Sequence, residues 1–225
     1  MTNIPDFSIV VPVFNSELAL LKLNEELQKI PLVLDLKIEI IYVDDSSKDN
    51  SLLLIQDLSK RFSNIKSLRN LTNQGQIKTT NKGIEHTLGN FIVTIDDDLE
   101  YPPSEIIKLY KTITEKGADI VFGISKDKYD LQDKNVWFAN LRNKILNKIW
   151  NKPKTESFKI FRRSVVFDES RFLITSNFEA FIAKRNFKIE YVNTDFNKRM
   201  FGRSNYNWIR KIKFIIEMNA GFLKN

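Results

Sequence analysis

The sequence predicts an α/β fold in which helices cover a mostly parallel sheet, and two observations carry that prediction. Short apolar, β-branched runs of strand length alternate with longer segments whose leucines and isoleucines recur at helical spacing. From residue 7 to residue 123 the order is strand then helix, repeated until a fifth strand is reached. This order is typical of a doubly wound parallel sheet, because each parallel pair of strands needs a crossover connection.

Local signals place the elements of this first half. The segment 7–13 is a continuous apolar run, as expected for a strand buried on both faces. Pro102 and Pro103 favour the start of a helix, because the missing N–H of proline is not needed in the first turn. The expected strands are 7–13, 37–43, 65–68, 91–95 and 118–123, and the expected helices are 17–30, 50–62, 78–88 and one that runs from the prolines through Ile113.

The second half has a different character. After a charged loop at 126–134, the patterns predict helices at 137–150 and 177–185 and strands at 157–161 and 188–192. We expect one domain over residues 1–206, followed by a basic amphipathic helix over 207–225. That helix is suited either to an anionic membrane surface or to packing on the domain with its lysines in water.

Composition bounds the partners and the compartment. Of 225 residues, 35 are basic and 28 acidic, so the net charge of +7 favours anionic ligands. No recognised nucleic-acid-binding motif accompanies this charge, and nucleic acid is not expected as a partner. The absence of cysteine excludes disulfides and thiolate metal sites. Without a signal peptide or an apolar run of about 18 residues, we expect a cytoplasmic protein whose membrane contact, if any, is peripheral at the inner face.

Acidic side chains follow two of the predicted strands. Asp44 and Asp45 end the strand 37–43, and Asp96, Asp97 and Asp98, with Glu100, follow the strand 91–95. In open α/β sheets ligands bind at this carboxyl edge.

Alternation along an extended segment puts Asp96, Asp98 and Glu100 on one side, where their charges repel unless a cation lies between them. Oxygen ligands favour Mg2+ or Mn2+. The alternative is a solvated acidic turn that caps the next helix.

Six motifs in order resemble those of the family 2 glycosyltransferases. They are VPVFN at 11–15, DDSSKDNS at 44–51, NQGQ at 73–76, DDDLEYPPSE at 96–105, FKIFRR at 158–163 and RMFGRSNY at 199–206. The acidic motif and the last two are similar to the branch that contains dolichyl-phosphate mannose synthase and bacterial polyprenyl-phosphate glycosyltransferases. The sequence departs from that branch at Ser16 and Glu100, which stand for Glu and Gln, and at Arg203 and Asn205, where Glu and Lys are more frequent.

The resemblance implies a fold and a set of roles. The fold is GT-A, a Rossmann-like three-layer α/β/α sandwich around a mostly parallel sheet. Implied donor-binding residues are Pro12, Phe14, Asp45 and Asp96; implied metal ligands for Mg2+ or Mn2+ are Asp96, Asp98 and Glu100; candidate catalytic residues are Asp97, Asp98 and Glu179; and candidate ligands of an acceptor phosphate are Lys159, Arg199, Arg203 and Ser204.

The implied reaction is an inverting transfer from a nucleoside-diphosphate sugar, in which a divalent ion neutralises the departing charge. A sugar hydroxyl must lose a proton as it attacks, yet no Glu-Asp pair lies between 170 and 188, where Glu179 stands alone. A polyprenyl phosphate is already anionic and needs only cations. We therefore expect a lipid-phosphate acceptor. A saccharide hydroxyl, with Glu179 or Asp97 as base in lipopolysaccharide or capsule assembly, is the alternative.

Two hypotheses of other classes remain. A nucleotidyltransferase would usually carry a Gly-rich, Arg- or Lys-bearing loop after its first strand, which VPVFNSE lacks. A non-catalytic, membrane-surface accessory protein would tolerate loss of Asp98 without functional consequence.

Overall fold

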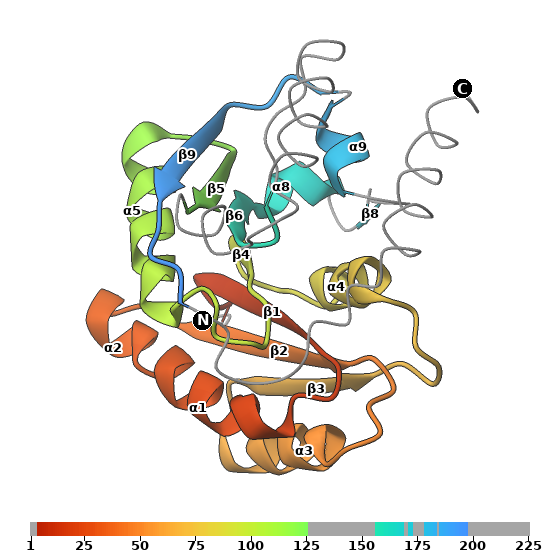
Figure 1. Cartoon of the computed structure of the whole chain (residues 1–225). Helices are drawn as coiled ribbons and strands as arrows, with labels where there is room; N and C mark the ends of the chain where they lie inside the picture. Colours follow the sequence, from red (N-terminus) through yellow and green to blue (C-terminus); the bar gives the residue numbers. More distant parts are fainter. Residues whose placement is uncertain (1–3, 126–155, 169–170, 173–177, 184, 198–225) are drawn as a thin grey trace, which may run out of the picture.

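The computed structural model describes residues 4–125, 156–168, 171–172, 178–183 and 185–197, and these form a sheet covered by helices (Figure 1). Seven strands lie in the order β3-β2-β1-β4-β6-β5-β9. Their bounds are β1 Phe7–Val13, β2 Ile38–Asp44, β3 Ile65–Arg69, β4 Phe91–Thr94, β5 Ile120–Ile124, β6 Lys159–Arg162 and β9 Ile189–Asn193; a separate pair consists of β7 Phe167–Asp168 and β8 Arg171–Phe172.

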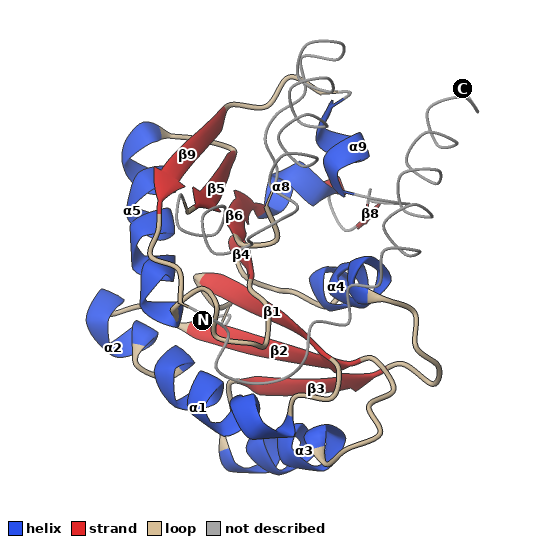
Figure 2. Cartoon of the chain, viewed as in Figure 1, coloured by secondary structure: helices blue, strands red, loops and turns tan. Residues whose placement is uncertain are grey.

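Helices cover both faces of the sheet, as Figure 2 shows. Side chains of α1, α3 and α5 pack with Phe7, Ile9 and Val11 of β1 in one buried cluster. Side chains of α4, α8 and α9 pack with Val10 in a second cluster on the opposite face. The described helices are α1 Glu17–Leu27, α2 Ile30–Leu34, α3 Ser51–Arg61, α4 Gln76–Glu85, the 3-10 turn η1 Pro103–Glu105, α5 Ile106–Lys116, α8 Arg163–Val166 and α9 Phe178–Ala183. The three-layer α/β/α arrangement is therefore confirmed.

The sequence pattern was wrong about one helix and missed three short elements. The single helix expected over 17–30 is two helices, because Pro31 lies in the first turn of α2 and cannot continue a helical hydrogen-bond ladder. The strand expected at 157–161 is β6, which runs antiparallel to both β4 and β5. The short helix α8 and the pair β7–β8 had no counterpart among the expected elements. The predicted helices 137–150 and 207–225 lie outside the described residues.

The topology collects the ends of the parallel strands at one edge. β1 pairs in parallel with β2 on one side and with β4 on the other. The chain order thus reverses between β1 and β4, and α/β sheets generally bind ligands at such a switch point. The loops that follow β1, β2, β3 and β4 all lie at this edge.

None of the described helices is long and apolar enough to cross a membrane.

Candidate active site

The loops after β1 and β2 are held together by reciprocal hydrogen bonds. The N–H of Asn15 donates to Ser47 Oγ at 3.0 Å, and Asn15 Oδ1 accepts from the N–H of Lys48 at 2.8 Å. The N–H of Asn50 donates to Glu17 Oε2 at 2.9 Å. Asn15 has a φ of 54°, a left-handed conformation that asparagine tolerates better than most residues. The two loops therefore form one unit, which includes Phe14.

Asp45 anchors the loop between β3 and α4. Its side chain is buried, and Oδ1 accepts from Asn70 Nδ2 and from the N–H of Gln74, both at 2.8 Å. Oδ2 accepts from the N–H of Gly75 at 2.8 Å. Gly75 has a φ of 82°, which favours glycine, and α4 begins at the next residue. A carboxylate has about four acceptor positions, so about one is left for a ligand such as a nucleotide base.

Asp97 binds the backbone of the loop after β1. Its Oδ2 accepts from the N–H of Phe14 at 3.1 Å and from the hydroxyl of Ser16. The pKa of Asp97 is raised to about 7, mainly by burial; the two hydrogen bonds oppose this rise, and the neighbouring charges of Asp96 and Asp98 add to it. Asp97 thus positions the loop that carries Phe14.

Asp96 has different partners from Asp97. Its Oδ1 accepts from Gln76 Nε2 at 2.6 Å, and its Oδ2 accepts from Ser157 Oγ at 2.8 Å. Gln76 is the first residue of α4, and Ser157 lies just before β6. Asp96 and Asp97 therefore bind separate parts of the site, as the alternation of side chains predicted.

The chain turns sharply after Asp98. The strand β4 ends at Thr94, and Leu99 has a φ of 60° although its side chain is buried. The N–H of Glu100 donates to Asp98 Oδ1 at 3.1 Å, and the carbonyl of Glu100 accepts from the N–H of Asn197 at 2.7 Å. The expected extended alternation therefore stops before Glu100, and this turn sets the position of that carboxylate.

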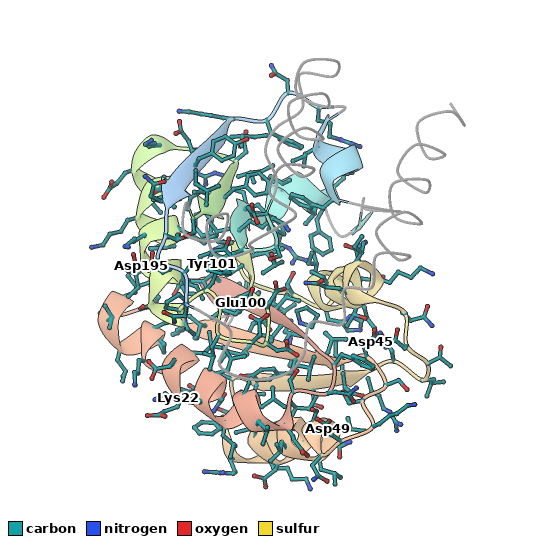
Figure 3. All side chains as sticks on the ribbon, viewed as in Figure 1. Lys22, Asp45, Asp49, Glu100, Tyr101 and Asp195 are labelled. Carbon is teal, nitrogen blue, oxygen red and sulfur yellow. The ribbon has the colours of Figure 1, made fainter. Side chains whose placement is uncertain are left out.

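Aromatic contacts hold the outer part of this turn. The Tyr101 ring stacks on Phe158 with centroids 4.8 Å apart and meets Phe196 edge-on at 5.1 Å. Figure 3 labels Glu100 and Tyr101 beside Asp195, with Asp45 at the other end of the edge. The acidic turn is thereby packed between β6 and the segment that follows β9.

The acidic loop fits a divalent ion that is completed by its ligand. Among the described residues, no three acidic or histidine side chains are placed to cage a metal. Mg2+ and Mn2+ do not require such a cage, since one or two carboxylates, waters and substrate phosphates commonly suffice. The oxygen donors of Asp96, Asp98 and Glu100, which follow one another within a single loop, have the right chemistry for that arrangement.

The structure describes only some of the remaining predicted site residues. Pro12 lies on β1 opposite Val43, next to the loop that carries Phe14. Lys159 is buried on β6, where its ammonium donates to the carbonyl of Glu156 at 3.1 Å and lies 5.0 Å from the Phe178 ring centroid. Glu179 is in α9. Arg199, Arg203 and Ser204 lie outside the described residues.

Sequence reasoning overlooked Gln76 and Ser157 as partners of Asp96. Gln76 could have been identified from the sequence, because it belongs to the motif NQGQ at the start of a predicted helix. Ser157 had no comparable signal, since it precedes the motif FKIFRR and meets Asp96 from 61 residues away.

Comparisons with known proteins agree with this geometry. Residues 8–183 match the family model for glycosyl transferase family 2. An undecaprenyl-phosphate 4-deoxy-4-formamido-L-arabinose transferase of Proteus mirabilis is 28% identical over 94% of this chain and 66% of its own length. An uncharacterized protein of Methanocaldococcus jannaschii is 31% identical over 64% of this chain and 63% of its own. The chain thus spans a little under two thirds of the length of these relatives.

Solved structures share the fold at low sequence identity. A mannosyltransferase of Pyrobaculum calidifontis, in complex with GDP-Man and Mn2+, superposes with a TM-score of 0.68 at 15% identity, covering 100% of this chain and 66% of its own. Glucosyl-3-phosphoglycerate synthase of Mycobacterium tuberculosis, with Mn2+, UDP and glucosyl-3-phosphoglycerate, gives a TM-score of 0.58 at 16% identity and covers 93% of this chain and 75% of its own. The matched motifs, the sheet order and the family match over most of the chain lead to one conclusion: this chain belongs to glycosyl transferase family 2 and has the GT-A fold.

Proposed function

We propose that this chain transfers a sugar from a nucleoside-diphosphate sugar to a polyprenyl-phosphate-type acceptor, with inversion and with a divalent metal ion. The observation that carries the proposal is the link between two acidic strand ends. The N–H of Gly75 binds Asp45 at 2.8 Å, and the side chain of the next residue, Gln76, binds Asp96 at 2.6 Å. Two consecutive residues, Gly75 and Gln76, thus connect Asp45, the proposed partner of the nucleotide base, with Asp96, the proposed contact at the other end of the nucleotide.

The proposed donor lies at the edge of the sheet where β1 and β4 end. Phe14 packs beside the base, and the remaining acceptor position of Asp45 receives a hydrogen bond from it. Asp96 contacts the nucleotide end. Asp98 and Glu100 hold Mg2+ or Mn2+, which when bound neutralises the charge of the departing diphosphate. Two structural relatives were solved in complex with Mn2+, which supports this role.

The acceptor proposal rests on charge and on one relative. The Proteus mirabilis protein, which aligns with 94% of this chain, is named for an undecaprenyl-phosphate acceptor. The carboxylate of Asp97 accepts hydrogen bonds from the N–H of Phe14 and the hydroxyl of Ser16, so its described contacts are structural and not those of a base. A phosphate acceptor needs no base. Lys159, Arg199, Arg203 and Ser204 are the proposed phosphate ligands, and peripheral contact with a membrane follows from a lipid acceptor.

The proposal is tested with a panel of nucleotide sugars and Mn2+, offered with undecaprenyl phosphate or with a saccharide acceptor. We expect release of the nucleoside diphosphate only when the lipid phosphate is present, and loss of that release on addition of a chelator. Asp98→Asn should abolish turnover while the melting temperature stays close to that of the parent. Transfer to the saccharide alone would overturn the lipid-phosphate assignment, and no release from any donor would overturn the transferase proposal.

A further inference from the structure

The carboxylate of Asp96 is held from two sides by uncharged donors. Gln76 Nε2 binds Oδ1 at 2.6 Å and Ser157 Oγ binds Oδ2 at 2.8 Å. These partners are 20 and 61 residues away in the sequence, one at the start of α4 and the other just before β6. A carboxylate bound at both oxygens cannot rotate without breaking at least one bond, so its orientation is fixed.

Each donor is itself fixed by the fold. Gln76 follows Gly75, whose N–H is bound by the buried Asp45. The carbonyl of Ser157 accepts from Thr94 Oγ1 at 2.5 Å, and Thr94 is the last residue of β4. The two hydrogen bonds to Asp96 therefore depend on where α4 and β6 lie relative to β4.

The Gln76 and Ser157 groups that bind Asp96 are both uncharged. An amide and a hydroxyl orient a carboxylate without neutralising it, whereas an arginine or lysine partner would cancel its attraction for a cation. The buried ammonium of Lys159 donates to the main-chain carbonyls of Glu156 and Ser157.

We propose that Gln76 and Ser157 are positioning residues that orient Asp96 toward the metal-bound diphosphate of the donor. The inference rests on the proposed function and extends it to two residues outside the acidic motif. Groups that orient metal-binding carboxylates typically contribute about 10- to 100-fold to metal affinity. Loss of either donor lets the Asp96 side chain rotate away, and binding of the nucleotide with its metal weakens.

The test measures binding of UDP, GDP and dTDP by calorimetry, with and without Mn2+. For the nucleotide that the parent binds, Ser157→Ala and Gln76→Met are each expected to weaken Mn2+-dependent binding by about tenfold. Ser157→Thr keeps the hydroxyl and should restore binding to within about threefold of the parent. Ser104→Ala and Gln56→Met, which make the same kinds of change at exposed positions, serve as matched controls and should bind like the parent.

A double mutant separates positioning from a general structural role. In an Asp96→Asn background, Ser157→Ala should cause little further loss, because both changes act through the same carboxylate. Full additivity of the two losses would overturn the inference, as would unchanged binding in both single variants. A parent chain that binds none of the three nucleotides with Mn2+ would refute the proposed function itself and this inference with it.

Discussion

Asp97 accepts a 3.1 Å hydrogen bond from the backbone N–H of Phe14, 83 residues earlier in the chain. The bond joins the acidic loop after β4 to the loop after β1, and the hydroxyl of Ser16 supports it. The charged form of Asp97 lowers the stability of the folded state, because the carboxylate is partly buried and lies between the charges of Asp96 and Asp98.

Asp97→Asn is therefore expected to stabilise the protein above neutral pH. The pKa of Asp97 is raised to about 7 in the folded chain, above its ordinary value, so the folded state keeps a proton that the unfolded state loses. Stability consequently falls as the pH rises from about 4 to about 7, and the asparagine variant lacks this loss.

The measurement is urea unfolding with a chelator present, so that no metal contributes. At pH 8 we expect a gain of about 1–2 kcal/mol, less than the whole shift would give, because water screens a partly exposed carboxyl. At pH 4 the parent and the variant should have nearly equal free energies of unfolding. An equal difference at both pH values would contradict the assignment.

Asp45→Ala is expected to destabilise the protein and to abolish nucleotide binding. The change leaves Asn70 Nδ2 and the N–H groups of Gln74 and Gly75 without their acceptor. Each buried unsatisfied donor costs about 1–3 kcal/mol, and water that enters the exposed loop recovers part of this cost. We expect a net loss of about 2–4 kcal/mol in urea unfolding.

Asp57→Ala is the matched control for Asp45→Ala. Asp57 lies on α3, where its side chain is exposed and pairs only at the surface with Arg61 at 3.5 Å. Its loss should change the free energy of unfolding by less than about 0.5 kcal/mol. Similar losses in the two variants would show that the loop from residue 70 to 75 does not depend on Asp45.

The fold was predictable because its signals are local. The apolar run 7–13 and the leucine spacing of α3 each indicate, within one short segment, which side chains are buried. The strand and the helix that they predicted are both present. The direction of β6 was not predictable, since a short apolar strand reads the same whether it pairs in parallel or antiparallel. Only Pro31 carried a local signal for the break between α1 and α2.

The candidate site was predictable in its residue types and less so in its contacts. The three acidic residues after the strand 91–95 indicated which edge of the sheet binds ligands. Hydrogen-bond partners from distant segments, however, leave no pattern in the sequence around them. Ser157 meets Asp96 across 61 residues, and Asp45 is used by its own chain at both oxygens. The left-handed φ of Leu99 could not be predicted either, because a leucine in the sequence gives no signal for a turn.

Glu39→Ala should lower stability without affecting nucleotide binding. Glu39 is buried at the amino edge of the sheet, where it accepts from Ser8 Oγ at 2.6 Å and from the N–H of Leu88 at 2.5 Å, and pairs with Lys66 at 2.7 Å. Its removal leaves the Ser8 hydroxyl and the N–H of Leu88 without their acceptor, and each buried unsatisfied donor costs about 1–3 kcal/mol.

Binding by the folded fraction of Glu39→Ala should equal that of the parent, because the site lies at the opposite edge of the sheet. Lys66→Ala offers a milder companion change, since the Lys66 side chain is 41% exposed and water replaces part of its contact. A weakened affinity for nucleotide in Glu39→Ala would show that the two edges are coupled.

Gly89→Ala is expected to destabilise the same edge for a steric reason. A Cβ at residue 89 would lie 2.6 Å from the carbonyl carbon of Phe7 and 2.7 Å from the nitrogen of Ser8, and these backbone atoms belong to β1 and cannot yield cheaply. We expect a loss of about 1–3 kcal/mol in urea unfolding. Gly117→Ala provides the contrast, because its Cβ meets nothing within 4 Å and only its φ of 57° opposes alanine, at a cost of about 1 kcal/mol. If Gly89→Ala were as stable as the parent, the close approach of this loop to β1 would not exist in solution.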